Sequence, residues 1–120
     1  MDLEQLREYT LSKPDAEETQ PFGPDNLVYK INGKMFLLSN FDSYPLQFNV
    51  KCDPDLALEL REQYAAVIPG YHMNKKHWNT VYLDGSLHDD LICKMIGDSY
   101  QLVLQSLPGK IRSEIEQINI

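Results

Sequence analysis

The sequence contains little of what an exported or membrane-bound protein needs. Its longest uninterrupted apolar run, Tyr64 to Ile68, has five residues, whereas a membrane-spanning helix needs about 20. The first eight residues already contain four charged side chains, so they lack the apolar segment of a secretion signal. The chain has only two cysteines. We therefore expect a cytoplasmic protein with reduced thiols and no membrane partner.

The motifs of common catalytic sites are also missing. The six glycines are scattered rather than gathered into a phosphate-binding loop, and no Gly-x-Ser-x-Gly elbow is present. The candidate nucleophiles are Cys93, in an apolar helix where a thiol is inert packing, and Cys52, at a strand end where partial exposure is expected. Neither has a histidine at a spacing typical of cysteine enzymes. The sequence predicts no catalytic residue, no cofactor and no enzyme activity.

Histidines and carboxylates are too dispersed to predict a metal site. His72, His77 and His88 could bind a metal with Asp84 or Asp89, but no Cys-x-x-Cys or His-Glu-x-x-His motif accompanies them. Surface histidines are the favoured interpretation. Acidic residues also gather in the N-terminal third, where carboxylates bind hard cations weakly or simply face solvent: Asp2, Glu4, Glu8, Asp15, Glu17, Glu18 and Asp25.

What the 120 residues do contain is the pattern of one α+β domain over residues 1–120. The clearest local signal is a β-hairpin, because residues 27–31 and 34–38 flank Asn32-Gly33, the dipeptide favoured in a type I′ turn. Residues 46–51 then alternate between apolar and polar side chains, which predicts a third strand with one wet face.

The first part of the chain adds two helices and a loop to this hairpin. Residues 2–12 predict a helix capped by Asp2, and residues 15–25, with two prolines and a glycine, predict a loop. Asp53-Pro54 is typical of a helix start, and Pro69-Gly70 should end that helix.

The second part predicts one strand and two more helices. Residues 78–83 form the strand, and Ser86 with Asp89 has the spacing of a capping box for a long helix that Pro108-Gly109 ends. A short final helix contains Ile111, Ile115 and Ile118. The expected order is helix, three strands, helix, strand and two helices, with a largely antiparallel sheet.

Charge is unevenly distributed along the chain. The net charge is −7, yet residues 28–52 and residues 67–83 each sum to +2, so the remainder sums to −11. The negative total should repel nucleic acid and anionic membranes at long range. If the two positive stretches are neighbours in space, however, the domain has one weakly basic face and an acidic back.

The stretch from Tyr71 to Asn79 mixes aromatic rings, amides and cations, which are the residue types that stack on bases and contact phosphates. The candidate nucleic-acid-binding residues are Lys34 at the hairpin tip together with Tyr71, Asn74, Lys75, Lys76, His77 and Trp78. The alternative is that Trp78 begins a core strand and the rest is a solvated connection. The residues alone favour this alternative.

Residues 69–86, PGYHMNKKHWNTVYLDGS, closely resemble the central block of the MmcQ/YjbR family, as do Asp98-Ser99-Tyr100 and residues 107–112. Ser12-Lys13-Pro14 and Pro21-Phe22-Gly23 support the resemblance. It implies a frataxin/CyaY-like fold, with helices packed on one face of an antiparallel sheet. It also implies a double wing of β-hairpins, for which DNA binding has been proposed from shape. It supplies no catalytic residues.

We therefore expect a non-enzymatic binding module that binds nucleic acid weakly through a hairpin and loop face. The alternative follows from the frataxin resemblance: a protein-interaction, small-ligand or metal-binding module that uses the acidic first helix. The two hypotheses require opposite faces of the domain. The sequence predicts no oligomeric state.

Overall fold

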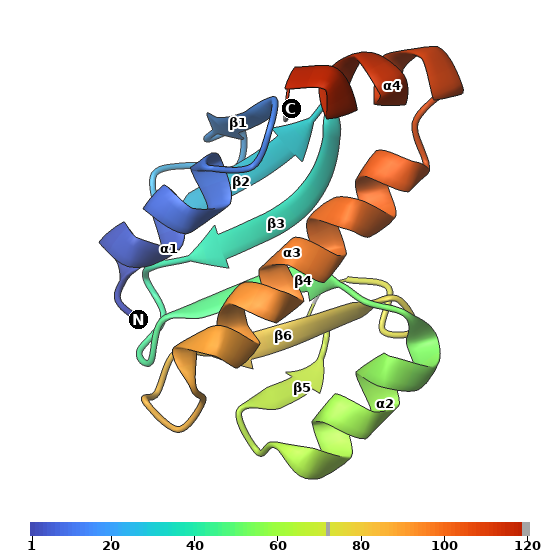
Figure 1. Cartoon of the computed structure of the whole chain (residues 1–120). Coiled ribbons are helices and arrows are strands. Elements are labelled where there is room, and N and C mark those ends of the chain that lie inside the picture. The colour runs from blue at the N-terminus through green and yellow to red at the C-terminus, as the bar shows by residue number, and fades with distance from the viewer. Residues whose placement is uncertain (72, 119–120) are drawn as a thin grey trace.

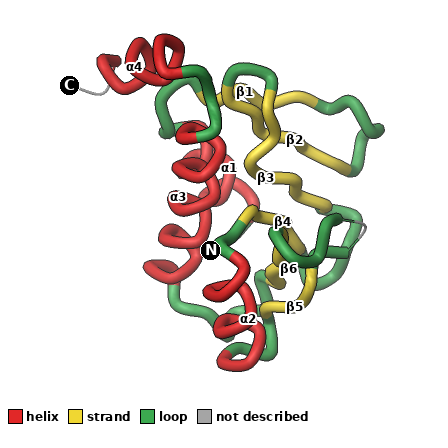
Figure 2. Tube along the Cα trace, turned by 90° about the vertical axis from the view of Figure 1, so that its right-hand side faces the viewer, coloured by secondary structure: helices red, strands yellow, loops and turns green. Residues whose placement is uncertain are grey.

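The computed structural model of the chain describes residues 1–71 and 73–118; of residue 118 it describes only the backbone. Six strands form one antiparallel sheet in the order β1-β2-β3-β4-β6-β5. The strands are β1 (Ala16–Thr19), β2 (Asn26–Ile31), β3 (Lys34–Asn40), β4 (Gln47–Lys51), β5 (Val67–Pro69) and β6 (Trp78–Tyr82). The helices are α1 (Leu3–Leu11), α2 (Pro54–Gln63), α3 (Asp89–Gln105) and α4 (Gly109–Ile118). They lie on one side of the sheet (Figures 1 and 2), which confirms the predicted α+β architecture.

Local sequence chemistry sets several of these boundaries. The Asp2 carboxylate accepts a hydrogen bond from the Gln5 backbone N–H (2.8 Å), and the Gln5 side chain accepts one from the Asp2 N–H (2.9 Å). This capping box starts α1 as predicted. Asp53 caps α2 by accepting hydrogen bonds from the backbone N–H groups of Asp55 and Leu56. In the hairpin turn Asn32 and Gly33 have φ angles of 50° and 81°, as a type I′ turn requires.

Two strands were not predicted, and both lie at edges of the sheet. Residues 15–25 contain β1, which pairs with β2. Its Glu18 accepts two hydrogen bonds from Arg7 (2.9 Å each) and one from the Tyr29 hydroxyl (2.8 Å). Hydrogen bonding to the Arg7 guanidinium holds the pKa of Glu18 below its ordinary value. The prediction of a loop was therefore wrong for residues 16–19 and correct for residues 20–25. An acidic strand held by distant partners has no local hydrophobic pattern that would reveal it.

The second helix ends earlier than predicted. It stops at Gln63, because Tyr64 is extended with φ −127° and ψ 121°. Residues 67–69 pair with β6 as the edge strand β5. The apolar run from Tyr64 suits a helix face or a buried strand equally well, and its pairing with a distant strand decides between them.

The N-cap of α3 also differs from the prediction. Ser86 donates its backbone N–H and its hydroxyl to the Asp84 carboxylate (2.9 and 2.6 Å), so it belongs to a turn. His88 is the cap instead, and its Nδ1 accepts the Asp90 N–H at 3.1 Å. The helix therefore begins one residue after His88, at Asp89.

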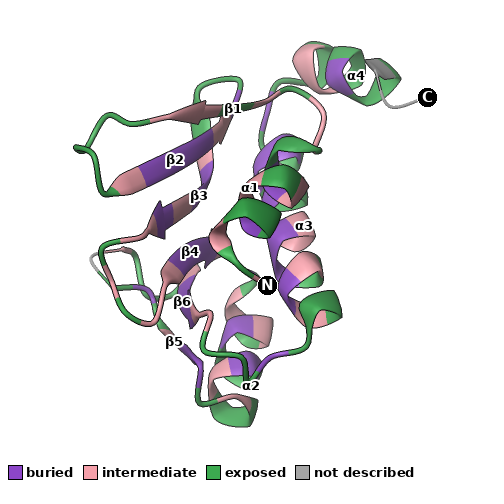
Figure 3. Cartoon of the chain, turned by 90° about the vertical axis from the view of Figure 1, so that its left-hand side faces the viewer, coloured by how far each residue is buried: buried purple, intermediate pink, exposed green. Residues whose placement is uncertain are grey.

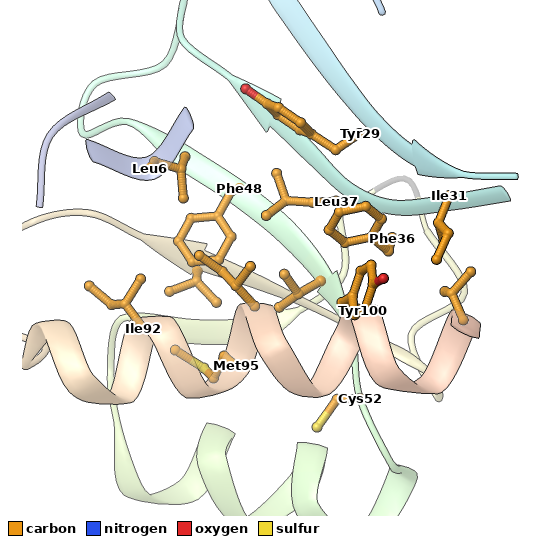
Figure 4. Close-up of a cluster of buried hydrophobic side chains, with 14 of the residues drawn as sticks. Leu6, Tyr29, Ile31, Phe36, Leu37, Phe48, Cys52, Ile92, Met95 and Tyr100 are labelled. Atoms are coloured by element: carbon orange, nitrogen blue, oxygen red, sulfur yellow. The ribbon is translucent and has the colours of Figure 1, made fainter. Parts of the chain in front are cut away.

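The core lies between α3 and the sheet (Figure 4). Tyr100 of α3 packs edge-on against Phe36 of β3, with ring centroids 5.4 Å apart. Cys52 belongs to this core and is buried, so the expectation that its side chain is partly exposed was wrong. Other members of the cluster include Leu6, Tyr29, Ile31, Leu37, Phe48, Val50, Ile92, Met95, Ile96 and Val103.

Ser99 joins α3 to two strands by hydrogen bonds. The register of β2 against β3 shifts at a bulge that leaves Phe36 without a cross-strand partner. The buried Ser99 hydroxyl donates to the Phe36 carbonyl (2.5 Å) and accepts the Lys51 N–H (2.8 Å). It therefore satisfies two backbone groups that would otherwise be buried without partners.

We predict that Ser99→Ala lowers the free energy of unfolding by about 2 to 3 kcal/mol, because it leaves both backbone groups buried without a hydrogen-bond partner. Ser113→Ala, at an exposed position of α4, is the matched control and should change stability by less than about 0.5 kcal/mol. Urea unfolding of both variants measures the difference. Equal stability of the two variants would contradict the assigned role of Ser99.

Candidate nucleic-acid interface

The sheet has one face that the helices leave uncovered. Side chains alternate between the two faces of a strand, and the Phe48, Val50 and Val81 side chains belong to the core under the helices. The residues next to them along each strand therefore lie on the other face. The residues that pair with those neighbours on adjacent strands lie there too. We call this face the open face. It contains Glu17, Thr19, Asn26, Val28, Lys30, Met35, Leu38, Asn40, Gln47, Asn49, Lys51, Ile68, Trp78, Thr80 and Tyr82.

The strands behind this face contain cations and almost no acid. Strands β2 to β6 contain three lysines, Lys30, Lys34 and Lys51, and no Asp or Glu. In β1, Glu17 pairs across the strand with Lys30. Among the described residues, none of these lysines is within 4 Å of a carboxylate, whereas Arg7, Lys94 and Arg112 all form ion pairs. Because β4 pairs with both β3 and β6, the two positive stretches of the sequence are neighbours.

The 70–77 loop is attached to the open face. It joins β5 to β6, and the structure describes all of it except His72. The Tyr71 backbone N–H donates to the Thr80 hydroxyl oxygen (2.9 Å). The Thr80 hydroxyl donates to the Asn49 side-chain oxygen, and the Asn49 amide donates to the Leu38 carbonyl (3.4 Å). Thr80 and Asn49 are both buried. This chain of hydrogen bonds connects the loop to β6, β4 and β3.

Arg61 of α2 holds the same loop from the helix side. Its Nε donates to the side-chain oxygen of the buried Asn79 (2.6 Å). Its terminal nitrogen donates to the carbonyls of Trp78 (3.2 Å) and Lys75. A guanidinium suits this role because its planar donors can serve several acceptors at once. Sequence reasoning missed Arg61; the only signal was a cation next to Leu60 in the apolar stripe of its helix.

Asn74 organises the loop internally. Its side-chain oxygen accepts the Lys76 N–H (3.0 Å), and its carbonyl accepts the N–H groups of His77 (3.2 Å) and Trp78 (2.9 Å). The His77 carbonyl accepts the Cys52 N–H at 2.7 Å. Asn74 therefore holds the loop. Lys75 and Lys76 are exposed residues of this loop, and the Lys75 ammonium donates back to the Gly70 carbonyl (3.4 Å).

The structure brings six of the seven predicted residues together in positions 71–78. Lys34 is two strands away from Trp78, or about 10 Å in the hydrogen-bonding direction. It pairs with the core residue Ile31, so it lies on the helix side of the sheet at the hairpin tip, and the structure does not bring it to the open face. Trp78 is partly buried on the open face and lies outside the core cluster. The interpretation of Trp78 as the start of a core strand is thus correct for the strand and wrong for the side chain.

The described residues offer no metal centre, since no three His, Cys, Asp or Glu side chains among them are grouped to hold an ion. His88 caps α3 and Asp84 accepts from Ser86. His72 lies outside the described residues. In the acidic N-terminal third, the Asp2 carboxylate caps α1 and Glu18 pairs with Arg7.

The thiols are poor nucleophiles at neutral pH. Burial raises the pKa of Cys52 to about 11, and burial with the nearby Asp89 and Asp90 raises the pKa of Cys93. A hollow of about 270 Å³ beside Cys52 lies between α2 and α3. Its two carboxylates are already engaged, because Asp53 caps α2 and Asp98 pairs with Lys94 at 2.7 Å.

The sequence model of the YjbR family matches residues 11–102. The chain belongs to the YjbR family. "Uncharacterized protein YbdF" of Escherichia coli O157:H7 is 40% identical over 96% of this chain and 98% of that protein. "Uncharacterized protein YjbR" of Escherichia coli K12 is 34% identical over 98% of this chain and 100% of that protein. The family expected from residues 69–86 is confirmed.

Solved structures share the fold of this YjbR-family chain. A crystal structure from Deinococcus radiodurans, described as a DUF419 domain, matches with a TM-score of 0.89 and 34% identity over 95% of this chain and 87% of that one. A crystal structure from Pseudomonas syringae matches with a TM-score of 0.75 and 33% identity over 85% of this chain and 98% of that one. The likeness to frataxin stays a prediction. Among the described residues, no helix is long and apolar enough to span a membrane.

We predict that Arg61→Lys loosens the 70–77 loop, because an ammonium cannot reproduce the divergent hydrogen bonds of a guanidinium. The free energy of unfolding should fall by about 1 to 2 kcal/mol. Hydrogen exchange of the Met73, His77 and Trp78 amides should accelerate more than exchange in α3. Arg112→Lys on α4 is the control. Unchanged exchange in the loop would show that Arg61 does not hold it.

We also predict that the Cys52 thiol is protected in the native protein. Between pH 7 and 8 a disulfide reagent should modify Cys52 at least about tenfold more slowly in the folded than in the urea-unfolded chain, because both burial and the raised pKa suppress the thiolate. The rate should rise as pH approaches 11. Cys93→Ala isolates this signal, and Cys52→Ala provides the control. Equal rates in the folded and unfolded chains would contradict the burial of Cys52.

Proposed function

We propose that this YjbR-family protein is a non-enzymatic module that binds nucleic acid through the open face and the 70–77 loop. The observation that supports this most directly is the separation of charge. Strands β2 to β6 and the loop together contain five lysines and no carboxylate, although the whole chain has a net charge of −7. An unpaired group of cations on an otherwise acidic protein is the usual requirement for contact with phosphates.

Two features make the loop suitable for binding. Thr80 holds it from the open face and Arg61 holds it from α2, through partners that are themselves buried. A loop that is already ordered loses less conformational entropy when it binds a ligand. Lys75 and Lys76 are exposed at its surface, and long flexible side chains of this kind can reach phosphates as point charges.

The proposed binding is weak and salt-dependent. Lys75 and Lys76, with Lys30 and Lys51 of the open face, allow two to four phosphate contacts, so the logarithm of the binding constant should fall with the logarithm of salt concentration with a slope of about −2 to −3.5. The acidic remainder of the chain reduces the association rate further, because it repels a polyanion at long range.

We predict that Lys75→Glu combined with Lys76→Glu weakens binding to a labelled oligonucleotide by at least about tenfold at low salt and reduces the salt slope by about 2. Fluorescence anisotropy measures both quantities. The fold should stay intact, since exposed lysines contribute little to stability. Lys110→Glu with Arg112→Glu on α4 changes the net charge equally and should bind like the parent.

Two results would contradict the proposed function. One is the absence of binding by the parent protein at concentrations up to about 100 µM at low salt. The other is a Lys75 and Lys76 double variant that binds as tightly as the α4 control. In either case the 70–77 loop would be a structural connection.

A further inference from the structure

Three aromatic side chains among the described residues are exposed, and each is in a different loop. Phe22 is 64% exposed in the loop between β1 and β2, Tyr44 is 101% exposed between β3 and β4, and Tyr71 is 60% exposed in the 70–77 loop. The other aromatic residues of the chain are buried or partly buried.

The three loops lie on the same side of the molecule. In Figures 2 and 3 they extend from the sheet away from the helices. The first two loops meet at one end of the open face, where the Phe41 N–H donates to the Asp25 carbonyl (3.0 Å). The 70–77 loop is at the other end, because β6 starts there with Trp78 paired to Lys51. Exposed rings are therefore present at both ends of the open face.

Exposed rings in separate loops fit one class of ligand better than others. Bases of a single strand can stack on separate aromatic rings regardless of sequence, whereas the bases of a duplex are already stacked on each other. Protein partners instead favour aromatic anchors that gather at the centre of one patch. The open face presents the amides of Asn40 and Gln47 at the first end and the Lys51 ammonium at the other, groups that contact phosphates and sugars. Asn49 and Thr80, which lie between them, are buried.

We infer that the ligand is single-stranded nucleic acid, with Phe22, Tyr44 and Tyr71 as stacking residues and the lysines of the open face and loop as phosphate contacts. This inference rests on the proposed function and narrows it to one class of ligand. It also explains how a chain with a net charge of −7 can bind a polyanion, because stacking adds affinity that does not depend on positive charge.

The test compares two probes, fluorescein-labelled dT12 and a mixed-sequence 12-base-pair duplex, by anisotropy at low salt. The parent should bind dT12 at least about tenfold more tightly than the duplex. The triple variant Phe22→Ala, Tyr44→Ala, Tyr71→Ala should bind dT12 with an affinity at least about 30-fold lower than that of the parent, whereas its affinity for the duplex should change little. The matched control removes three exposed leucines from the helices, as Leu11→Ala, Leu58→Ala and Leu102→Ala, and should bind dT12 like the parent.

Two further variants separate stacking from folding. Tyr44→Phe with Tyr71→Phe retains the rings and should retain the affinity for dT12. Tyr44→Ala alone changes a fully exposed side chain, so it should weaken binding to dT12 without changing stability.

The outcomes distinguish this inference from the proposed function. Tighter binding to the duplex than to dT12, or equal binding of dT12 by the parent and the triple alanine variant, would overturn the single-strand inference and leave nucleic-acid binding in place. Binding to neither probe would overturn both. A protein partner would then be the better explanation of the exposed rings.

Discussion

The packing of α3 against the sheet determines which surface the molecule can use. This helix contacts β2, β3 and β4. The Phe36–Tyr100 ring contact lies in that layer, and Ser99 bonds the helix to backbone groups of β3 and β4. Once one face of the sheet is covered in this way, alternation along each strand places the Asn49, Lys51 and Thr80 side chains on the opposite face. The composition of the open face therefore follows from the hydrophobic face beneath it.

Function in this fold depends on loops that the sheet positions. The 70–77 loop has little regular structure of its own, yet polar groups of two elements hold it. They are the buried Thr80 in β6 and the partly buried Arg61 in α2, which is bonded to the buried Asn79. Buried polar groups are costly unless they are hydrogen-bonded. Each contact therefore fixes the loop and also gives a buried polar group a hydrogen-bond partner. The same loop contains Lys75 and Lys76, which have no carboxylate partner among the described residues. An ordered backbone and exposed lysines without a carboxylate partner are thus combined in the described part of this loop, although the Lys75 ammonium donates to the Gly70 carbonyl.

Sequence reasoning succeeded where the cause of a structure is local. Asn32-Gly33 and the caps at Asp2 and Asp53 act within a few residues, and the hairpin turn and the starts of both helices formed as predicted. It failed where the cause is distant. Strand β1 exists because Ala16 to Thr19 pair with β2, and the burial of Cys52 depends on the packing of α3 against the sheet. In the candidate site, composition indicated residues 71–78. It could not indicate Arg61, which bonds to atoms 14 to 18 residues away. Phe22 and Tyr44 became candidate ligand contacts only when the structure placed their loops beside the open face.

The most direct test of the account is a ¹H–¹⁵N NMR titration of the whole protein with unlabelled dT12. If the open face binds nucleic acid, the resonances that move should be the Trp78 indole N–H, the side-chain amides of Asn40 and Gln47, and the backbone amides of Lys75 and Lys76. The amides of Leu58 and Leu102, which are exposed on α2 and α3, should stay in place. Movements confined to α2 and α3, or no movement at all, would contradict the assignment of the open face as the binding surface.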